Sequence, residues 1–296
     1  MGSVVKFAPD SKCITELSSP FREALMDRLS EREDLKHLIF SPSYSTSKFQ
    51  TLASVFCVTS RRWLIVIFQG DGSTTVAECS YDATLLVELT LILLFGQLKI
   101  DFVQDGAAKS IALHFNTVMQ HTYSDAIQYI LDAIDGPENI ATSFGRNRNP
   151  TVSSWPLKFR NFAIIYMPKK SLWLDGVCWK EIRASFGREL APAAAALVTD
   201  RHLVVIAEEK ISRWFQFRHD AKYGAIITYF PLNRLADFRI HPYPRFGILE
   251  LEAYDGHGGE KLEIIFPPDE REAVSRVLGK AKPDRWPVSP EKRSGR

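Results

Sequence analysis

The chain has 296 residues, of which 45% are hydrophobic, and a formal net charge of +2. This length allows about two domains, and the apolar share is enough for packed cores. Six bases and two acids from Lys280 onward give the end of the chain a net charge of +4, so the remainder is slightly acidic. Since nucleic-acid-binding proteins usually have a basic folded domain, we expect no nucleic-acid partner.

The chain carries no pattern typical of export or membrane insertion. Its first residues lack the apolar stretch of a signal peptide. The longest apolar run, Leu85 to Phe95, is interrupted by Glu88 and Thr90 and is shorter than the roughly 20 residues that span a bilayer. Four scattered cysteines without a CxxC pair suit a reducing compartment. These features predict a cytoplasmic protein without a transmembrane segment.

The first half is predicted to contain a helix, a series of strands and a second helix. The first helix begins at Ser19-Pro20, because proline fits the first helical turn. The leucine-rich run is predicted as a strand, since Glu88 and Thr90 are two positions apart, and a buried Glu88 would need a partner, for which we expect an arginine. The other expected strands are 38–44, 52–59, 63–68, 75–80, 97–102 and 110–115, followed by a helix over 123–134.

The second half is predicted to be similar. Leu157–Met167 and Leu172–Trp179 are expected to form a hairpin around Pro168-Lys169-Lys170-Ser171. Further strands are expected over 193–199, 203–207, 226–230, 235–240, 248–254 and 261–266, and an apolar stripe predicts a helix at 273–278.

Two patterns occur in both halves. Val58–Ile67 recurs loosely as Val198–Ala207, 140 positions later, and Phe95–Asp101 recurs as Phe246–Glu252, 151 positions later. One β-rich unit used twice explains both, and the change of offset places about eleven extra residues between Glu208 and Tyr223.

The turn sequence Leu197-Val198-Thr199-Asp200-Arg201-His202-Leu203-Val204, and Val58–Leu64 in the first half, resemble a motif of bacterial PH-like and GRAM-like proteins. These families belong to the pleckstrin-homology superfold. The resemblance implies a mainly β, α+β fold with two tandem PH-like curved antiparallel sheets or split barrels. Each would be closed by a C-terminal amphipathic helix, with a further helix at the N-terminus. The expected divisions are an N-terminal segment 1–36, a first domain 37–137, a linker 138–154, a second domain 155–282 and a basic disordered tail 283–296.

Two groups of bases are candidate ligand-binding or partner-binding residues. The extra segment of the second half interleaves bases with aromatic rings, as a lipid headgroup or an anionic ligand would require, although packing of an elongated hairpin is the alternative. Its candidates are Arg213, Trp214, Phe215, Arg218 and Lys222. The resemblance also points to Lys169 and Lys170, because phosphoinositide-binding PH domains use bases in their first hairpin; a solvated turn is the alternative.

The remaining motifs favour structure over chemistry. Arg61 and Arg201 belong to the repeated turn, where a structural role is favoured over ligand contact. Gly256-His257-Gly258-Gly259 is interpreted as a hairpin turn, because a strand follows it and a phosphate loop needs a helix. The histidines lack metal-ligand spacing, and nucleophile and phosphate-loop motifs are absent. We therefore expect no enzyme, no cofactor and no metal.

The sequence thus favours a non-catalytic binding or scaffolding protein that contacts a protein partner. The alternative is recognition of an anionic lipid or phosphoinositide-type headgroup at a membrane surface. A third hypothesis is an enzyme with a site between the two domains. Because fold analogy is a weak guide to function, these stay hypotheses.

Overall fold

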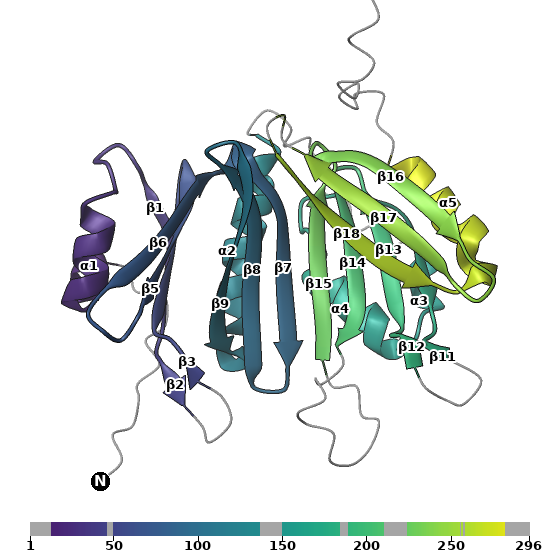
Figure 1. The fold of residues 1–296 in the computed structure, drawn as a ribbon, viewed down its shortest axis with the longest axis horizontal. Helices are drawn as coiled ribbons and strands as arrows, with labels where there is room; N and C mark the ends of the chain where they lie inside the picture. Colours follow the sequence, from purple (N-terminus) through teal and green to yellow (C-terminus); the bar gives the residue numbers. More distant parts are fainter. Residues whose placement is uncertain are drawn as a thin grey trace, which may run out of the picture.

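The computed structural model describes residues 13–45, 50–136, 150–183, 189–209, 224–254, 256 and 258–281. The described chain consists mainly of antiparallel β-sheets with a smaller share of helix (Figure 1). The predicted α+β, mainly β class is therefore confirmed.

The first half begins with a 3-10 turn, η1 (Ile14–Glu16), and the predicted N-terminal helix α1 (Ser19–Met26). A four-stranded sheet follows in the order β1-β4-β5-β6, with a small β2-β3 hairpin between its first two strands. The bounds are β1 (Leu35–Ser41), β2 (Tyr44–Ser45), β3 (Gln50–Thr51), β4 (Ser54–Thr59), β5 (Arg62–Phe68) and β6 (Thr74–Ser80). Then come η2 (Tyr81–Ala83), β7 (Thr84–Ile92), β8 (Phe95–Gln104), β9 (Ala107–Asn116), η3 (Thr117–Met119) and α2 (Gln120–Ile134). The leucine-rich run from Leu85 to Phe95 is thus a strand, β7, as predicted, but only as far as Ile92, because Leu93 and Leu94 form the turn to β8.

The second half repeats this order. It begins with α3 (Pro150–Ser153), α4 (Leu157–Tyr166) and β10 (Trp173–Trp179), and a small β11-β12 hairpin precedes β13. The bounds are β11 (Ile182–Arg183), β12 (Glu189–Ala191), β13 (Ala194–Thr199), β14 (His202–Glu209), β15 (Gly224–Pro231), β16 (Leu235–Pro242), β17 (Gly247–Tyr254), β18 (Gly259–Phe266), η6 (Pro268–Glu270) and α5 (Arg271–Lys280). Strands β16, β17 and β18 form a separate sheet.

One prediction about this half is wrong. Residues 157–166 form helix α4 and not a strand, so Pro168–Ser171 joins a helix to β10 and is not a hairpin turn. The buried side chains of Phe159, Ala163 and Tyr166 are four and three positions apart, which is the spacing of a helix face packed on a sheet. The aromatic and β-branched composition of this segment had favoured a strand.

The strand registers match between the halves. Irregularities occur between Leu35 and His37 in β1 and between Trp173 and Asp175 in β10. Arg62 pairs with Ser80, whereas His202, 140 positions after Arg62, pairs with Pro231, 151 positions after Ser80. The change of offset therefore lies between β14 and β15, where the sequence comparison placed it.

The two halves share one sheet. Strand β15 of the second half pairs with β7 of the first, from Gly224 opposite Ile92 to Tyr229 opposite Val87. The result is a seven-stranded antiparallel sheet in the order β10-β13-β14-β15-β7-β8-β9 (Figure 1). We call the β15–β7 pairing the joint.

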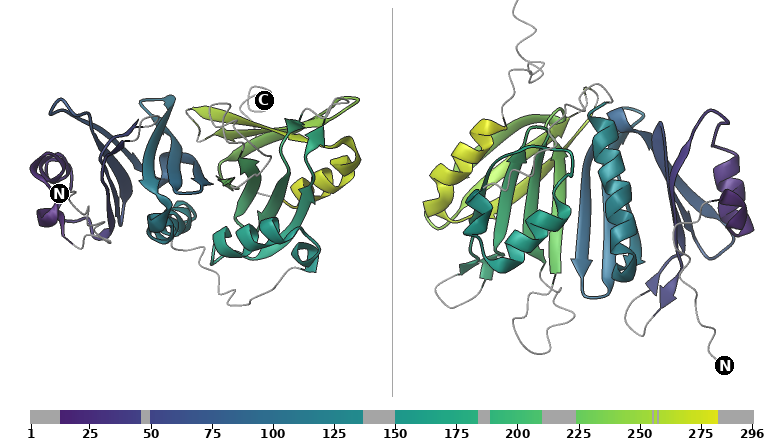
Figure 2. Two further views of the ribbon diagram at one scale, coloured as in Figure 1. Left: turned by 90° about the horizontal axis from the view of Figure 1, so that it is seen from below. Right: turned by 180° about the vertical axis from the view of Figure 1, so that it is seen from behind.

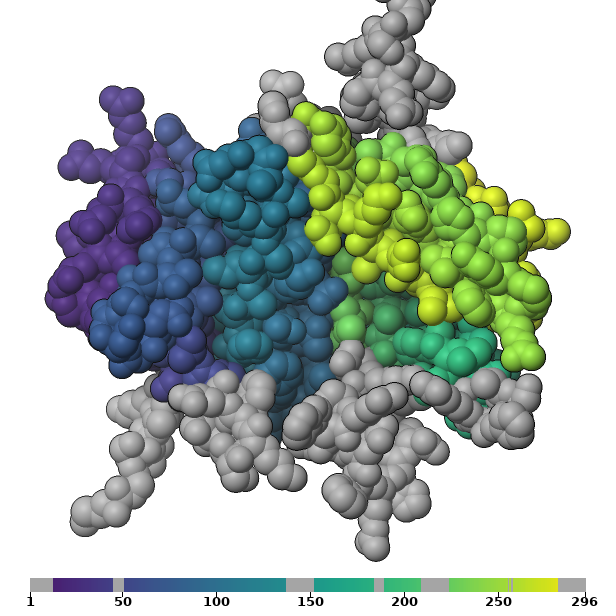
Figure 3. All heavy atoms as spheres, in the orientation of Figure 1, coloured from purple at the N-terminus to yellow at the C-terminus, as the bar shows by residue number. Residues whose placement is uncertain are grey.

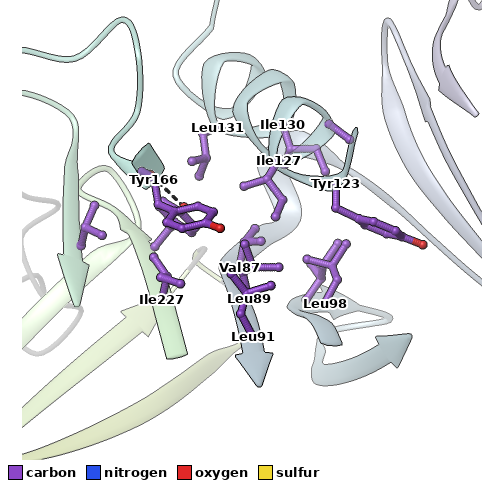
Figure 4. Packing of buried hydrophobic residues seen from close by; sticks show 14 of the residues in the cluster. Val87, Leu89, Leu91, Leu98, Tyr123, Ile127, Ile130, Leu131, Tyr166 and Ile227 are labelled. Carbon is purple, nitrogen blue, oxygen red and sulfur yellow. Dashed lines mark hydrogen bonds between the residues drawn. The ribbon is translucent and has the colours of Figure 1, made fainter. Parts of the chain in front are cut away.

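The joint also lies within a common hydrophobic core. Helices α2 and α4 cover the back of the seven-stranded sheet (Figure 2). Buried residues from both halves meet beneath them, with Ile227 and Tyr166 of the second half beside Leu89 and Leu131 of the first (Figure 4). Tyr229 Oη donates a hydrogen bond to the carbonyl of Tyr166 at 2.8 Å. Separating the halves would therefore expose apolar surface and unpair a strand.

Candidate binding surfaces

Lys169 and Lys170 are held against α2 of the first half. Lys169 Nζ lies 2.8 Å from Asp125 Oδ1, and Lys170 Nζ lies 2.7 Å from Asp132 Oδ2. The backbone N–H of Lys169 also donates to Gln128 Oε1 at 2.9 Å. With their charges paired, the two lysines serve the contact between the halves, and the hairpin that was expected to present them to an anion is not formed.

The other candidates, Arg213, Trp214, Phe215, Arg218 and Lys222, lie outside the described residues. The strand ends that this segment connects are described. Glu209, the last residue of β14, pairs with Gly224, the first residue of β15, and Gly224 pairs with Ile92 at the end of β7. The segment therefore joins the sheet beside the turn between β7 and β8.

The repeated Thr turn is structural in both halves. Thr199 Oγ1 accepts from the backbone N–H groups of Arg201 and His202 and donates to the carbonyl of His202. Thr59 makes the same three bonds in the first half. The side chain of the next residue accepts a hydrogen bond from the backbone N–H of the residue just before the first strand of its half: Ser60 from Asp34, and Asp200 from Leu172. These hydrogen bonds support the structural role that the sequence favours for the turn.

The turn arginines differ in their environment. Arg61 is exposed, whereas Arg201 is buried between the halves. Arg201 Nη1 and His202 Nε2 each lie 3.7 Å from Asp135 Oδ2, just beyond the end of α2. Burial raises the pKa of Asp135 to about 7, although Arg201 opposes this shift. Burial, with a smaller contribution from Arg201, lowers the pKa of His202 to about 3.

A polar strip crosses the front of the joint. Glu88 of β7 is half-buried between Thr228 of β15 and Lys99 of β8, its neighbours in the sheet. Burial raises the pKa of Glu88, while Lys99 and a hydrogen bond from Thr228 oppose the shift. Lys99 Nζ also lies 2.9 Å from the buried Asp101. The base that favours the charged form of Glu88 is thus a lysine and not the expected arginine, because strand register places Lys99 directly opposite, although Lys99 forms its ion pair with Asp101.

The turn between β7 and β8 carries exposed apolar side chains that sequence reasoning missed. Leu93, Leu94 and Val118, which we call the leucine tip, are exposed to 65%, 69% and 68%. Thr117 holds them together, since its N–H donates to the carbonyl of Leu94 and its Oγ1 donates to that of Leu93. The sequence signal that could have indicated these exposed side chains is the pair Leu93-Leu94 directly after β7.

Leu93 has a φ of 50°, a left-handed conformation that costs a branched side chain about 1–2 kcal/mol. The next turn along the chain, between β8 and β9 at the other end of the sheet, meets the same geometric demand with Asp105 and Gly106, at φ values of 56° and 74°. The leucine tip therefore keeps a large apolar residue where a turn residue would be more stable.

Helix α4 has a second exposed apolar group. Leu157, Ile164 and Ile165 are exposed to 61%, 64% and 53% on the side of α4 that faces away from the sheet. Tyr166 Oη lies 3.4 Å from Gln120 Oε1, so the end of α4 lies near the start of α2, two residues after Val118. On the opposite side of the seven-stranded sheet, the front in Figure 3, the β16-β17-β18 sheet packs against the start of β7, since Leu85 and Leu86 share a buried cluster with Leu249 and Leu251 of β17.

Among the described residues, no group of three or more His, Cys, Asp or Glu side chains is arranged to hold a metal ion. In the same part of the chain, no helix combines the length and apolar character needed to cross a membrane. Neither the protein-family models nor the curated proteins contain a match to this chain.

Proposed function

We propose that this chain is a non-catalytic binding protein in which two PH-like units are fused into one scaffold and a protein partner is held at the leucine tip. Each half has four strands in one sheet, three strands that follow, and a helix after the last strand, which supports the PH-like interpretation. The observation that carries the binding function is Leu93, because it is exposed and apolar at a position where its backbone conformation is unfavourable.

Replacement of Leu93 separates stability from function. In the Leu93→Asn variant we expect about 0.5–1 kcal/mol of added stability, since asparagine tolerates the left-handed conformation better than leucine. Partner binding should fall because the apolar contact is lost. Urea unfolding measures the first effect. A loss of stability in this variant would contradict the strained-turn interpretation.

Binding is tested by affinity capture from a lysate of the source cells, with quantification of the retained proteins. The Leu93→Asn/Leu94→Asn double variant should lose proteins that the unchanged chain retains. Met26→Asn is the matched control, because Met26 is 62% exposed on α1 at the far end of the first half. Equal retention by the double variant and the unchanged chain would refute the tip as the partner site.

A membrane surface is the second candidate. The sequence of segment 210–223 is rich in bases and aromatic residues, and its flanking residues Glu209 and Gly224 lie beside the end of β7, next to the leucine tip; this combination suits anionic lipid. Flotation with vesicles of neutral lipid, or of neutral lipid mixed with phosphatidylserine, distinguishes the two candidates. Binding only to anionic vesicles, lost at high salt and in the double variant, would favour the membrane; no binding at low salt would exclude it.

A further inference from the structure

Strand β6 of the first half has a free edge, whereas the corresponding edge of β15 in the second half is paired with β7. Strand β6 is the last strand of the β1-β4-β5-β6 sheet and pairs only with β5. Among the described residues, no strand is hydrogen-bonded to its other side, although β8 lies close to the end of β6, and β6 runs along the front of the sheet in Figure 1. Its counterpart β15 pairs with β14 on one side and with β7 on the other.

Strand register identifies the corresponding part of β6. Ser80 and Pro231 occupy equivalent places, because their partners Arg62 and His202 follow equivalent Thr turns. The six residues of β15 that pair with β7, 224–229, therefore correspond to residues 73–78. The end of β6 beyond them is covered, since Cys79 is buried and its Sγ lies 4.0 Å from the carbonyl of Val103.

The backbone of β6 has outward-facing groups. Phe68 donates its N–H to Ala53 on the far side of β5, and Gln69 donates to Ser73 at the start of β6. The pairing then continues without irregularity from Phe68 opposite Thr74. Because backbone direction alternates along a strand, Thr75 and Ala77 face β5, and Thr74, Val76 and Glu78 face away from it.

The free edges of β6 and β16 correspond to the two strands of the joint, and they differ in how well they are protected against pairing with another strand. Strand β16 occupies the place of β7 in the second half, and its edge carries the exposed ion pair Asp237–Arg239 and ends in Pro242. Pro242 has no N–H and stands where β7 has Leu91. Charges and proline are common devices against unwanted strand pairing. Strand β6 has neither proline nor lysine, and Glu78, its acidic residue, is paired with Arg62 at 3.1 Å.

We propose that the edge of β6 at residues 73–78 binds an extended, apolar segment of a partner protein as an added antiparallel strand, as β15 binds β7. This inference rests on the proposed binding function and specifies a second contact of that scaffold. Backbone hydrogen bonds would supply affinity, and alternate side chains of the segment would supply specificity. Its apolar residues would lie on the face of the sheet where Val76 packs against the buried cluster that contains Phe21 and Leu25 of α1.

A second copy of the chain fits this edge less well. The strand equivalent to β7 in another molecule is β16, where Arg239 and Pro242 replace Glu88 and Leu91. Strand β7 of another molecule is itself occupied by β15. A foreign segment is therefore the favoured occupant.

Amide hydrogen exchange by NMR on the full chain tests the proposal, with a synthetic peptide of residues 85–92 flanked by lysines as the probe. This peptide contains residues 87–92, which pair with the equivalent edge of β15. In the free chain, the amides of Thr74, Val76 and Glu78 should exchange quickly and those of Thr75 and Ala77 slowly. The peptide should slow exchange of the three outward amides by about tenfold or more.

The Thr75→Lys variant should abolish this protection, because it places a charge on an exposed edge side chain. Ser110→Lys, an exposed substitution on β9, is the matched control and should leave protection unchanged. Outward amides already protected in the free chain, or unaffected by the peptide, would overturn the proposal. Self-association abolished by Thr75→Lys would instead identify a second copy as the occupant. Because none of these variants alters the leucine tip, failure here is distinguishable from failure of the capture experiment.

Discussion

Helix α2 of the first half is 15 residues long, whereas α5, which follows the last strand of the second half, has 10. The shared part packs in the same way, since Tyr123 and Val274, 151 positions apart, are both buried. The additional turn of α2 reaches the second half, where Asp132 pairs with Lys170 and the carbonyl of Ile134 accepts from Asn233. The longer helix thus adds contacts with the second half to those that Asp125 and Gln128, in the shared part, make with Lys169.

The bulges in β1 and β10 contact the helix of their own half through different interactions. In the first half, the ring of His37 lies 6.0 Å from the ring of Tyr129 on α2. In the second half, the equivalent Asp175 forms ion pairs with Arg276 and Lys280 on α5. Lys280 lies 151 positions after Tyr129, so the equivalent helix position contacts the equivalent bulge through a ring contact in the first half and an ion pair in the second.

The largest expected effect distinguishes the joint from the free edge. Leu89 of β7 is fully buried in the joint, and the equivalent Ile240 of β16 is only partly buried. Leu89→Ala should lower the free energy of unfolding by about 2–5 kcal/mol, with a smaller loss for Ile240→Ala. Urea unfolding followed by tryptophan fluorescence measures both. Equal losses would mean that the joint contributes no more than an ordinary sheet edge.

A second pair of substitutions should have matching effects. A Cβ added to Gly96 would overlap the ring of Phe115, and one added to Gly247 would overlap the ring of Phe266. Gly96→Ala and Gly247→Ala should each destabilise the chain by about 1–3 kcal/mol, since a packed core resists added volume. Thermal unfolding provides the comparison. A neutral effect in one half would show that its phenylalanine can move and that the cores are not equivalent.

Asp135 and His202, buried between the halves, predict opposite pH dependences of stability for two variants. Asp135 has its pKa raised from an ordinary 3.8 to about 7, so its stabilising contribution is complete below pH 3.8 and is lost as the pH rises through 7. His202 has its pKa lowered from 6.5 to about 3, so its contribution is present above pH 6.5 and is lost as the pH falls toward 3. The two contributions oppose each other between about pH 4 and 6.5.

Replacing either Asp135 or His202 should therefore leave the pH dependence of stability that the other residue causes. In Asp135→Asn, stability should fall as the pH drops from 6.5 to 4; in His202→Gln, stability should rise over the same range. Each slope should approach about 1.4 kcal/mol per pH unit, the effect of one proton. Urea unfolding across this range is the measurement. Parallel pH profiles for the two variants would contradict the assigned directions.

The smallest effects are expected at the lysines that sequence analysis had selected. Lys169→Ala and Lys170→Ala should each cost at most about 0.5 kcal/mol, because both side chains are more than half exposed and solvent screens their ion pairs. The losses should diminish in high salt. If either variant weakened binding to anionic vesicles without changing stability, the headgroup hypothesis would regain these residues.

The sequence predicted elements whose signals are local. The Phe-Gly pairs marked equivalent strands, and the two polar residues of β7 were enough to distinguish a strand from a helix. Helix α4 was missed because Phe162, Ile164 and Ile165 favour a strand by composition, although Pro156 before the first helical residue resembles the start of α1. Its place before β10, like that of α1 before β1, was the other available signal.

The joint and the candidate surfaces could not be predicted in this way. Which strand pairs with the edge of β15 depends on how two distant units pack, and no local pattern in either strand specifies its partner. The leucine tip required the backbone conformation of Leu93, and the role of Lys169 depended on recognising α4 as a helix.

The pairing of β7 with β15 also has a consequence for synthesis of the chain. Residue 92 leaves the ribosome 132 residues before its partner Gly224. At about 5–20 residues per second, the apolar edge of β7 waits roughly 7–26 seconds without its partner strand. The nascent first half is thus the species most exposed to chaperones and to pairing with neighbouring nascent chains, and slow translation between the halves would prolong that exposure.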